Sequence, residues 1–103
     1  MHSKDAQMLV LTALAEGPMH GYAINTAIQS LTGTRLGPGS LYGALARLEA
    51  RRFIESAGDP SEEQQRQRTV RITTTGRAAL RAELEQMTKV ARAGLRALGS
   101  APA

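Results

Sequence analysis

The residues best suited to bind another molecule lie between Gly37 and Glu49. Leucines at positions 41, 45 and 48 recur at helical spacing and define one apolar face. The opposite face carries small residues and one long donor: Gly39, Gly43, Ala46, Arg47 and Ala50. A face this slim can approach another surface closely, and the major groove of DNA admits one α-helix. A core helix with an unremarkable outer face would show the same spacing, so the surrounding elements must decide.

A second chemical feature is a run of positive charge. Five arginines and no acid lie between Gln64 and Ala82, and the net charge of the chain is +4. Such a block is the electrostatic footprint of a protein that binds a polyanion. A charge run is also typical of a solvated face, and Glu49 and Glu55 are close enough to pair with some neighbouring arginines. Those arginines are Arg51, Arg52, Arg71 and Arg77.

Groups suited to catalysis or metal binding are scarce. The chain has no cysteine, which excludes disulfides and thiolate metal sites. His2 and His20 have no acid–base partner nearby in the sequence, and no glycine-rich phosphate loop follows a strand. We therefore expect no catalytic residue, no metal, no cofactor and no enzymatic activity. The N-terminus lacks the order of a signal peptide and no apolar run approaches ~18 residues, so we expect a cytoplasmic protein without membrane contact.

Periodicity and breaker residues predict the elements that position these groups. Helices are expected over 4–15, 20–31 and 38–52, because glycines and prolines interrupt the pattern between them. Strands at 53–56 and 68–72 would form a hairpin with a long polar tip. A last helix is expected over 74–98, capped by Thr73.

This order predicts a mainly α fold with a small β-hairpin: a winged helix-turn-helix plus a long C-terminal helix. Residues 1–73 would be the DNA-binding domain, with the 38–52 helix in the groove and the hairpin beside it as the wing. Residues 74–98 would be a dimerisation helix packed with the same domain, and residues 99–103 a disordered tail.

Within that fold the polar side chains receive separate roles. Ser40 and Tyr42 flank the groove-facing side and would hold phosphates, although Tyr42 could instead be a half-buried core tyrosine. Arg47 would read a base edge or hold another phosphate. Gly21 and Tyr22 are expected to serve packing. The full predicted DNA-binding set, the last three on the wing, is Gly39, Ser40, Tyr42, Gly43, Arg47, Gln65, Arg66 and Arg68.

The last helix carries a continuous apolar seam. Its members recur in a 4-3-4-4-3 pattern: Leu80, Leu84, Met87, Ala91, Leu95 and Leu98. A domain this small cannot cover a seam of that length, so we expect a two-fold dimer that also uses Met8 of the first helix. Folding of the seam onto its own core is the alternative.

Three segments resemble the PadR family of transcriptional regulators. Residues 11–22, LTALAEGPMHGY, are similar to its opening signature, and Gly39-Ser40-Leu41-Tyr42 to its recognition helix. Residues 70–77, VRITTTGR, resemble its closing strand and the start of its last helix. The resemblance implies a dimeric DNA-binding winged helix, usually a repressor, in the compact subgroup with a single C-terminal helix. It also implies that a ligand cavity often lies between the paired helices, where Leu84, Met87 and Ala91 would be the candidates to hold a small hydrophobic effector.

The chain departs from the family pattern at three places. Gly43 stands where proline is common, Gly37 where a serine-type cap is common, and Thr69-Val70 where a tyrosine is usual. The expected function is that of a sequence-specific regulator: a homodimer that represses transcription at a pseudo-palindromic operator. A small molecule bound at the dimer interface would relieve this repression. The alternative is a helical protein-interaction module with non-specific affinity for polyanions.

Overall fold

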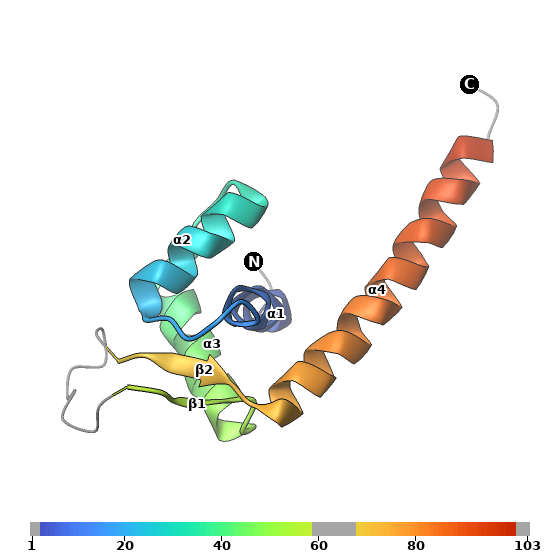
Figure 1. The fold of residues 1–103 in the computed structure, drawn as a ribbon. Coiled ribbons are helices and arrows are strands. Elements are labelled where there is room, and N and C mark those ends of the chain that lie inside the picture. The colour runs from blue at the N-terminus through green and yellow to red at the C-terminus, as the bar shows by residue number, and fades with distance from the viewer. Residues whose placement is uncertain (1–2, 59–67, 101–103) are drawn as a thin grey trace.

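The computed structural model of the chain describes residues 3–58 and 68–100. Three helices come first: α1 (Ser3–Leu14), α2 (Gly21–Thr32) and α3 (Pro38–Ala50). Strands β1 (Ile54–Ser56) and β2 (Val70–Ile72) follow, and α4 (Thr74–Ser100) ends the described chain. Figure 1 shows the strands as a hairpin beside α3, and α4 leaving the remaining elements in one direction. The predicted mainly α fold with one small hairpin is confirmed.

Four predicted boundaries need correction. Helix α3 ends at Ala50, two residues before the predicted end, and the strands begin at Ile54 and Val70 rather than at 53 and 68. Helix α4 includes Gly99 and Ser100, which the prediction placed in the tail at 99–103. Extending an existing helix by a residue is much easier than starting one, so a single glycine near its end does not stop it.

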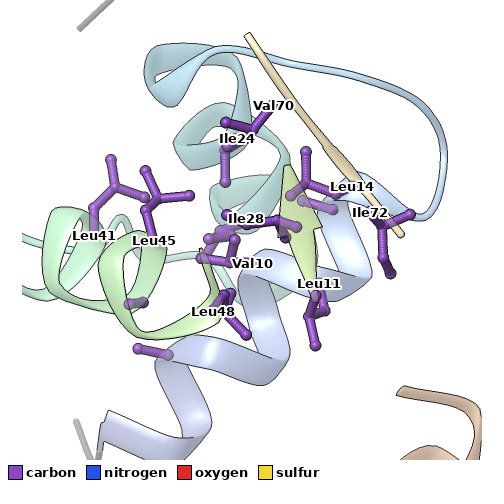
Figure 2. Close-up of a cluster of buried hydrophobic side chains, with 14 of the residues drawn as sticks. Val10, Leu11, Leu14, Ile24, Ile28, Leu41, Leu45, Leu48, Val70 and Ile72 are labelled. Atoms are coloured by element: carbon purple, nitrogen blue, oxygen red, sulfur yellow. The ribbon is translucent and has the colours of Figure 1, made fainter. Parts of the chain in front are cut away.

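The core is aliphatic and centres on α1. Leu14, Ile24, Ile28, Leu48 and Ile54 are the largest side chains that are almost completely buried. Figure 2 shows four of them, Leu14, Ile24, Ile28 and Leu48, together with Val70 and Ile72 of the second strand, among α1, α2 and α3. Each such side chain contributes roughly 1.5–3 kcal/mol by leaving water, and this burial holds the helix-turn-helix against α1.

The turn between α2 and α3 is fixed by one buried amide. Gly33 ends α2 in the left-handed conformation at φ 83°. The Asn25 side chain, 8% exposed, donates to the Leu36 carbonyl at 2.8 Å and accepts from the Leu36 amide at 2.8 Å. Because this pair satisfies a buried backbone N–H and C=O, it sets the path of the turn and the direction in which α3 leaves.

The end of α3 forms a Schellman motif. The Phe53 amide donates to the Leu48 carbonyl at 2.9 Å, and the Arg52 amide to the Glu49 carbonyl at 3.0 Å. Arg52 takes the left-handed conformation, φ 63°, at the position where glycine is most frequent. The motif uses the Phe53 amide, so the strand begins one residue later.

The hairpin is antiparallel, with Ile54 opposite Ile72 and Ser56 opposite Val70. Met19, from the connection between α1 and α2, bridges the other edge of β2 through two backbone hydrogen bonds with Val70, at 3.0 and 2.9 Å. The wing is therefore attached to the N-terminal half of the chain through β2.

Helix α4 starts directly on the end of α3. Thr73 donates its amide to the Phe53 carbonyl at 2.9 Å and its hydroxyl to the Arg52 carbonyl at 2.8 Å. The same hydroxyl accepts the Gly76 amide at 3.0 Å, which confirms Thr73 as the cap of α4. A methyl group at Gly76 would lie 2.2 Å from the Phe53 carbonyl oxygen, so only glycine allows this approach.

The apolar seam of α4 divides at Leu80. Leu80 is 6% exposed and belongs to the core of its own chain, so its prediction as a dimer-interface residue is corrected. Beyond it α4 leaves the domain, and the molecule measures 61 Å along its longest axis (Figure 1). The remaining seam residues Leu84, Met87, Ala91, Leu95 and Leu98 are exposed.

Candidate nucleic-acid interface

Helix α3 presents the slim face that its sequence predicts. Leu41, Ala44, Leu45 and Leu48 are buried, while Gly39, Ser40, Ala46 and Arg47 are exposed on the other side. A methyl group at Gly43 would meet only the Arg47 Nη1 atom, at 3.3 Å, so the guanidinium lies back over Gly43. The structure thus brings Gly39, Ser40, Gly43 and Arg47 together on one surface, with Arg47 as its single charged group.

Tyr42 stands at the edge of this surface and is half-buried. Its ring packs against the first turn of α2, where a methyl group at Gly21 would lie 3.3 Å from the Tyr42 hydroxyl. Gly21 therefore serves packing, as expected. The half-buried ring fits the packing interpretation of Tyr42, and the phosphate contact of its hydroxyl stays a prediction.

The described arginines of the hairpin are engaged with acids. Arg68 pairs with Glu49 at 3.0 Å and Arg71 with Glu55 at 2.9 Å. Exposed pairs of this kind stabilise a fold by at most about 1 kcal/mol, but each places a compensating negative charge beside the arginine. Arg68, predicted as a wing contact, is therefore partly neutralised. Gln65 and Arg66 lie outside the described residues.

Two further arginines, one from the basic run and one before it, are also held by the fold. Arg51 donates to the Gln7 side chain at 2.7 Å and lies 4.4 Å from the centre of the Phe53 ring. Arg77 donates to the Ala15 carbonyl at 3.4 Å. Both contacts link neighbouring elements to α1, and they give these arginines a structural role.

The helix-turn-helix itself carries an uncompensated positive charge. The sequence from Gly17 to Leu48 contains no acidic residue, and its arginines are Arg35 and Arg47. Arg35 donates to the Gln29 side chain at 2.9 Å and to the Thr26 hydroxyl at 3.4 Å. The electropositive surface thus includes α2 and α3, and is not limited to the hairpin.

Sequence reasoning missed Arg35 and misplaced Tyr22. Tyr22, which is expected to serve packing, is 72% exposed, and the Arg35 guanidinium lies 5.0 Å from the centre of its ring. The absence of acids over 17–48 was a signal that could have directed attention to Arg35. Tyr22 lies two positions before Ile24, on the side of α2 opposite the buried Ile24 and Ile28, so the helical spacing already indicated its exposure.

A hollow of about 280 Å³ lies between the starts of α2 and α3. Its walls include Tyr22, Arg35, Pro38 and Tyr42. Neither His20 nor Gly37 caps its helix with a side chain, in contrast to Thr73 at α4. The positive ends of both helix dipoles consequently add to the charge of Arg35 at this surface.

Other sites are less developed. Leu84 lines a hollow of about 230 Å³ with Ala15, Leu80 and two arginines, whereas Met87 and Ala91 lie further along α4 and are exposed. Met8 is half-buried and packs against the core of its own chain. Within residues 3–58 and 68–100 we find no cluster of three metal-binding side chains and no helix able to cross a membrane.

Comparison with known proteins yields consistent matches. The Transcriptional regulator PadR-like family matches residues 10–82. An uncharacterized 37.1 kDa protein in transposon TN4556 of Streptomyces fradiae is 56% identical over 90 residues, 87% of this chain. The chain covers 25%, about a quarter, of the length of that relative.

Two solved structures illustrate the similarity of fold. The transcriptional regulator Cth-833 from Clostridium thermocellum matches with a TM-score of 0.75 at 26% identity, over 90% of this chain and 89% of that one. A PadR family transcription regulator from Clostridium difficile R20291 matches with a TM-score of 0.75 at 20% identity, over 90% and 97% of the two chains.

Proposed function

This chain belongs to the PadR-like family of transcriptional regulators, and from that membership we propose that it is a cytoplasmic homodimer that represses transcription at a pseudo-palindromic operator. PadR regulators bind DNA, are generally dimeric and are not enzymes. The observation that carries the proposal is the outer face of α3, where small residues surround a single arginine above a fully apolar inner face.

The DNA contacts divide between positioning and reading. Ser40 and the Tyr42 hydroxyl lie at the edges of the α3 face and would hold phosphates. Gly39 and Gly43 keep the helix slim enough for the major groove, and Arg47 would reach a base edge. On the wing, Gln65 and Arg66 would contact the adjacent groove. Arg68 would contribute less than Arg66 would, because Glu49 already accepts its guanidinium.

A second copy of this chain is the occupant we assign to the exposed seam of α4. Leu84, Met87, Ala91 and Leu98 follow the alternating three- and four-residue spacing of helices that pair along their length. Leu95, 70% exposed, lies beside them. Pairing of two such helices would bury this seam and place two copies of α3 about a two-fold axis.

An effector site at Leu84, Met87 and Ala91 is part of the same proposal. Small side chains at Ala91 and Gly94 leave space between paired helices, which a small hydrophobic molecule could fill. Titration of the protein with hydrophobic ligands should move the amide chemical shifts of residues 84–95. Ligand binding that leaves those shifts unchanged would place the effector elsewhere.

Selection from a random duplex library at physiological salt tests the function directly. A two-fold-symmetric sequence bound about 10³-fold more tightly than scrambled DNA is the expected result. Failure to enrich any sequence, with binding that disappears as salt rises, would favour a helical protein-interaction module with non-specific affinity for polyanions, for which the exposed α4 seam is the supporting observation.

Two substitutions test the division of roles on the selected operator. Arg47→Ala should lower the affinity for the operator more than the affinity for scrambled DNA, because it removes a base contact. Arg66→Ala should weaken both by a similar factor, because it removes a charge near the backbone. Equal effects of both variants on both duplexes would contradict the assignment of Arg47 to base reading.

A further inference from the structure

We propose that Tyr22 and Arg35 form a second, sequence-independent DNA contact, which holds a backbone phosphate beside the start of α3. This inference rests on the proposed function, since it concerns the same DNA. It adds a contact from α2 and from the turn, neither of which carries a residue of the predicted DNA-binding set. Its role would be to fix the orientation at which α3 enters the groove.

Arg35 is already held in place without DNA. Its guanidinium lies 5.0 Å from the centre of the Tyr22 ring, and its Nη1 atom donates to Gln29 at 2.9 Å and to Thr26 at 3.4 Å. Among the described residues these bonds use only one of its three nitrogen atoms, so the others can face a ligand. A planar guanidinium fixed in this way loses little conformational freedom when it binds an oxyanion.

The charge of Arg35 is also available. Arg68 and Arg71 each have a carboxylate within 3.0 Å, whereas Arg35 has no acidic partner in the described part of the chain. No acidic residue occurs in the sequence from Gly17 to Leu48, which forms α2, the turn and most of α3. Binding of a phosphate by Arg35 would therefore displace counterions from DNA without breaking an ion pair of the protein.

Tyr22 supplies the second group of the contact. Its side chain is 72% exposed although tyrosine carries a large apolar ring, and it lies on α2, far along the chain from the α4 seam. The ring covers one face of the Arg35 guanidinium. Its hydroxyl can donate to a phosphate oxygen, as tyrosine hydroxyls do in many DNA complexes.

The position favours a phosphate over a base. Tyr22 and Arg35 line the 280 Å³ hollow together with Pro38 and Tyr42, so the contact lies at the start of α3 and beside its groove-facing surface. In helix-turn-helix proteins the helix before the reading helix crosses the DNA backbone. A phosphate in this hollow would lie next to the one we assign to Tyr42.

The test measures affinity for the selected operator and for a scrambled duplex between 50 and 200 mM salt. Arg35→Gln should weaken both duplexes by the same factor. In a dimer it removes two phosphate contacts, so the slope of log affinity against log salt concentration should become less steep by about 1.8. Between 50 and 200 mM salt, the factor by which affinity falls should therefore be about twelve times smaller for the variant than for wild type. Arg35→Lys should keep the salt slope while binding more weakly, because lysine retains the charge but not the planar fork.

Variants of Tyr22 separate the ring from the hydroxyl. Tyr22→Phe should slightly lower the affinity for both duplexes and leave the salt slope unchanged. Tyr22→Ala should lower the affinity for both duplexes nearly as much as Arg35→Gln does. Arg71→Gln is the matched control: it removes an arginine that pairs with Glu55, and it should change affinity less than twofold. Circular dichroism melting of each variant confirms that the fold is retained.

The outcomes distinguish this contact from the function itself. Wild-type protein that binds no duplex overturns the proposed function and this contact with it. Wild-type binding with an Arg35→Gln variant that has unchanged affinity and salt slope overturns the contact alone. A loss confined to the selected operator would also overturn it, because Arg35 would then read a base.

Discussion

Replacement of Gly43 by alanine should move stability and DNA affinity in opposite directions. Gly43 is in the middle of α3, where glycine costs about 1 kcal/mol relative to alanine. The added methyl group would meet only Arg47 Nη1, at 3.3 Å, and this flexible end can move aside. Gly43→Ala should therefore stabilise the fold by about 0.5–1 kcal/mol, a rise of several degrees in Tm for a domain of this size.

The same methyl group should weaken operator binding. It thickens the face that enters the groove and displaces the guanidinium that we assign to base reading. A base contact of this kind contributes about 1–3 kcal/mol, so the operator Kd should rise at least about fivefold. Thermal melting measures the change in Tm, and fluorescence anisotropy with labelled operator measures the change in Kd.

Ala46→Gly is the matched control on the same face, since it removes a methyl group where Gly43→Ala adds one. It should destabilise α3 by about 1 kcal/mol and leave the affinity of the folded protein nearly unchanged. If Gly43→Ala raises Tm and binds the operator like wild type, the slimness of α3 has no role in recognition. A fall in Tm would instead refute the packing we describe around Arg47.

Three further predictions concern packing and assembly. Asn25→Ala should lower the free energy of unfolding by about 2–4 kcal/mol in urea titrations, because it leaves the buried amide and carbonyl of Leu36 without partners. A loss below 1 kcal/mol would contradict the role we assign to these two hydrogen bonds. Gly76→Ala should lower the free energy of unfolding by about 3 kcal/mol or more, since its added methyl group would overlap the Phe53 carbonyl oxygen, a backbone atom that cannot move aside. A variant that melts like wild type would disprove this close approach. Met87→Glu should convert the dimer into a monomer in sedimentation experiments while each chain keeps its secondary structure, and a dimer that persists would locate the interface elsewhere.

The helices could be predicted because residues at their own ends determine where they begin and stop. Gly17-Pro18, Gly33 and Pro38 each have a conformational reason to end or begin a helix, whatever surrounds them. The strands were less accessible. Phe53 has the composition of a strand residue, but its amide bonds to Leu48 and its carbonyl to Thr73, both through contacts that form only in the folded chain.

The slim face of α3 was predictable from the sequence, and the distribution of charge was only partly so. The arginine run after Gln64 suggested a basic wing. The sequence also indicated that Glu55 could pair with Arg71, and the hairpin register confirms this pair. It did not indicate that the fold brings Arg68 to Glu49. Arg35 looked isolated in the sequence because the ring that it stacks on is thirteen positions earlier. Pairing depends on tertiary neighbours, which net charge does not reveal.

The close joint between Phe53 and Gly76 makes α4 a lever arm whose fulcrum is the end of the reading helix. With 27 residues, α4 is about 40 Å long. A rotation of about 10° at the fulcrum would move its far end by about 7 Å, roughly a fifth of the ~34–36 Å between successive major-groove half-sites. In the proposed dimer, a molecule that moves the two α4 helices apart would therefore change the spacing of the two α3 helices. They would no longer match successive major-groove half-sites, although the molecule contacts neither α3 helix.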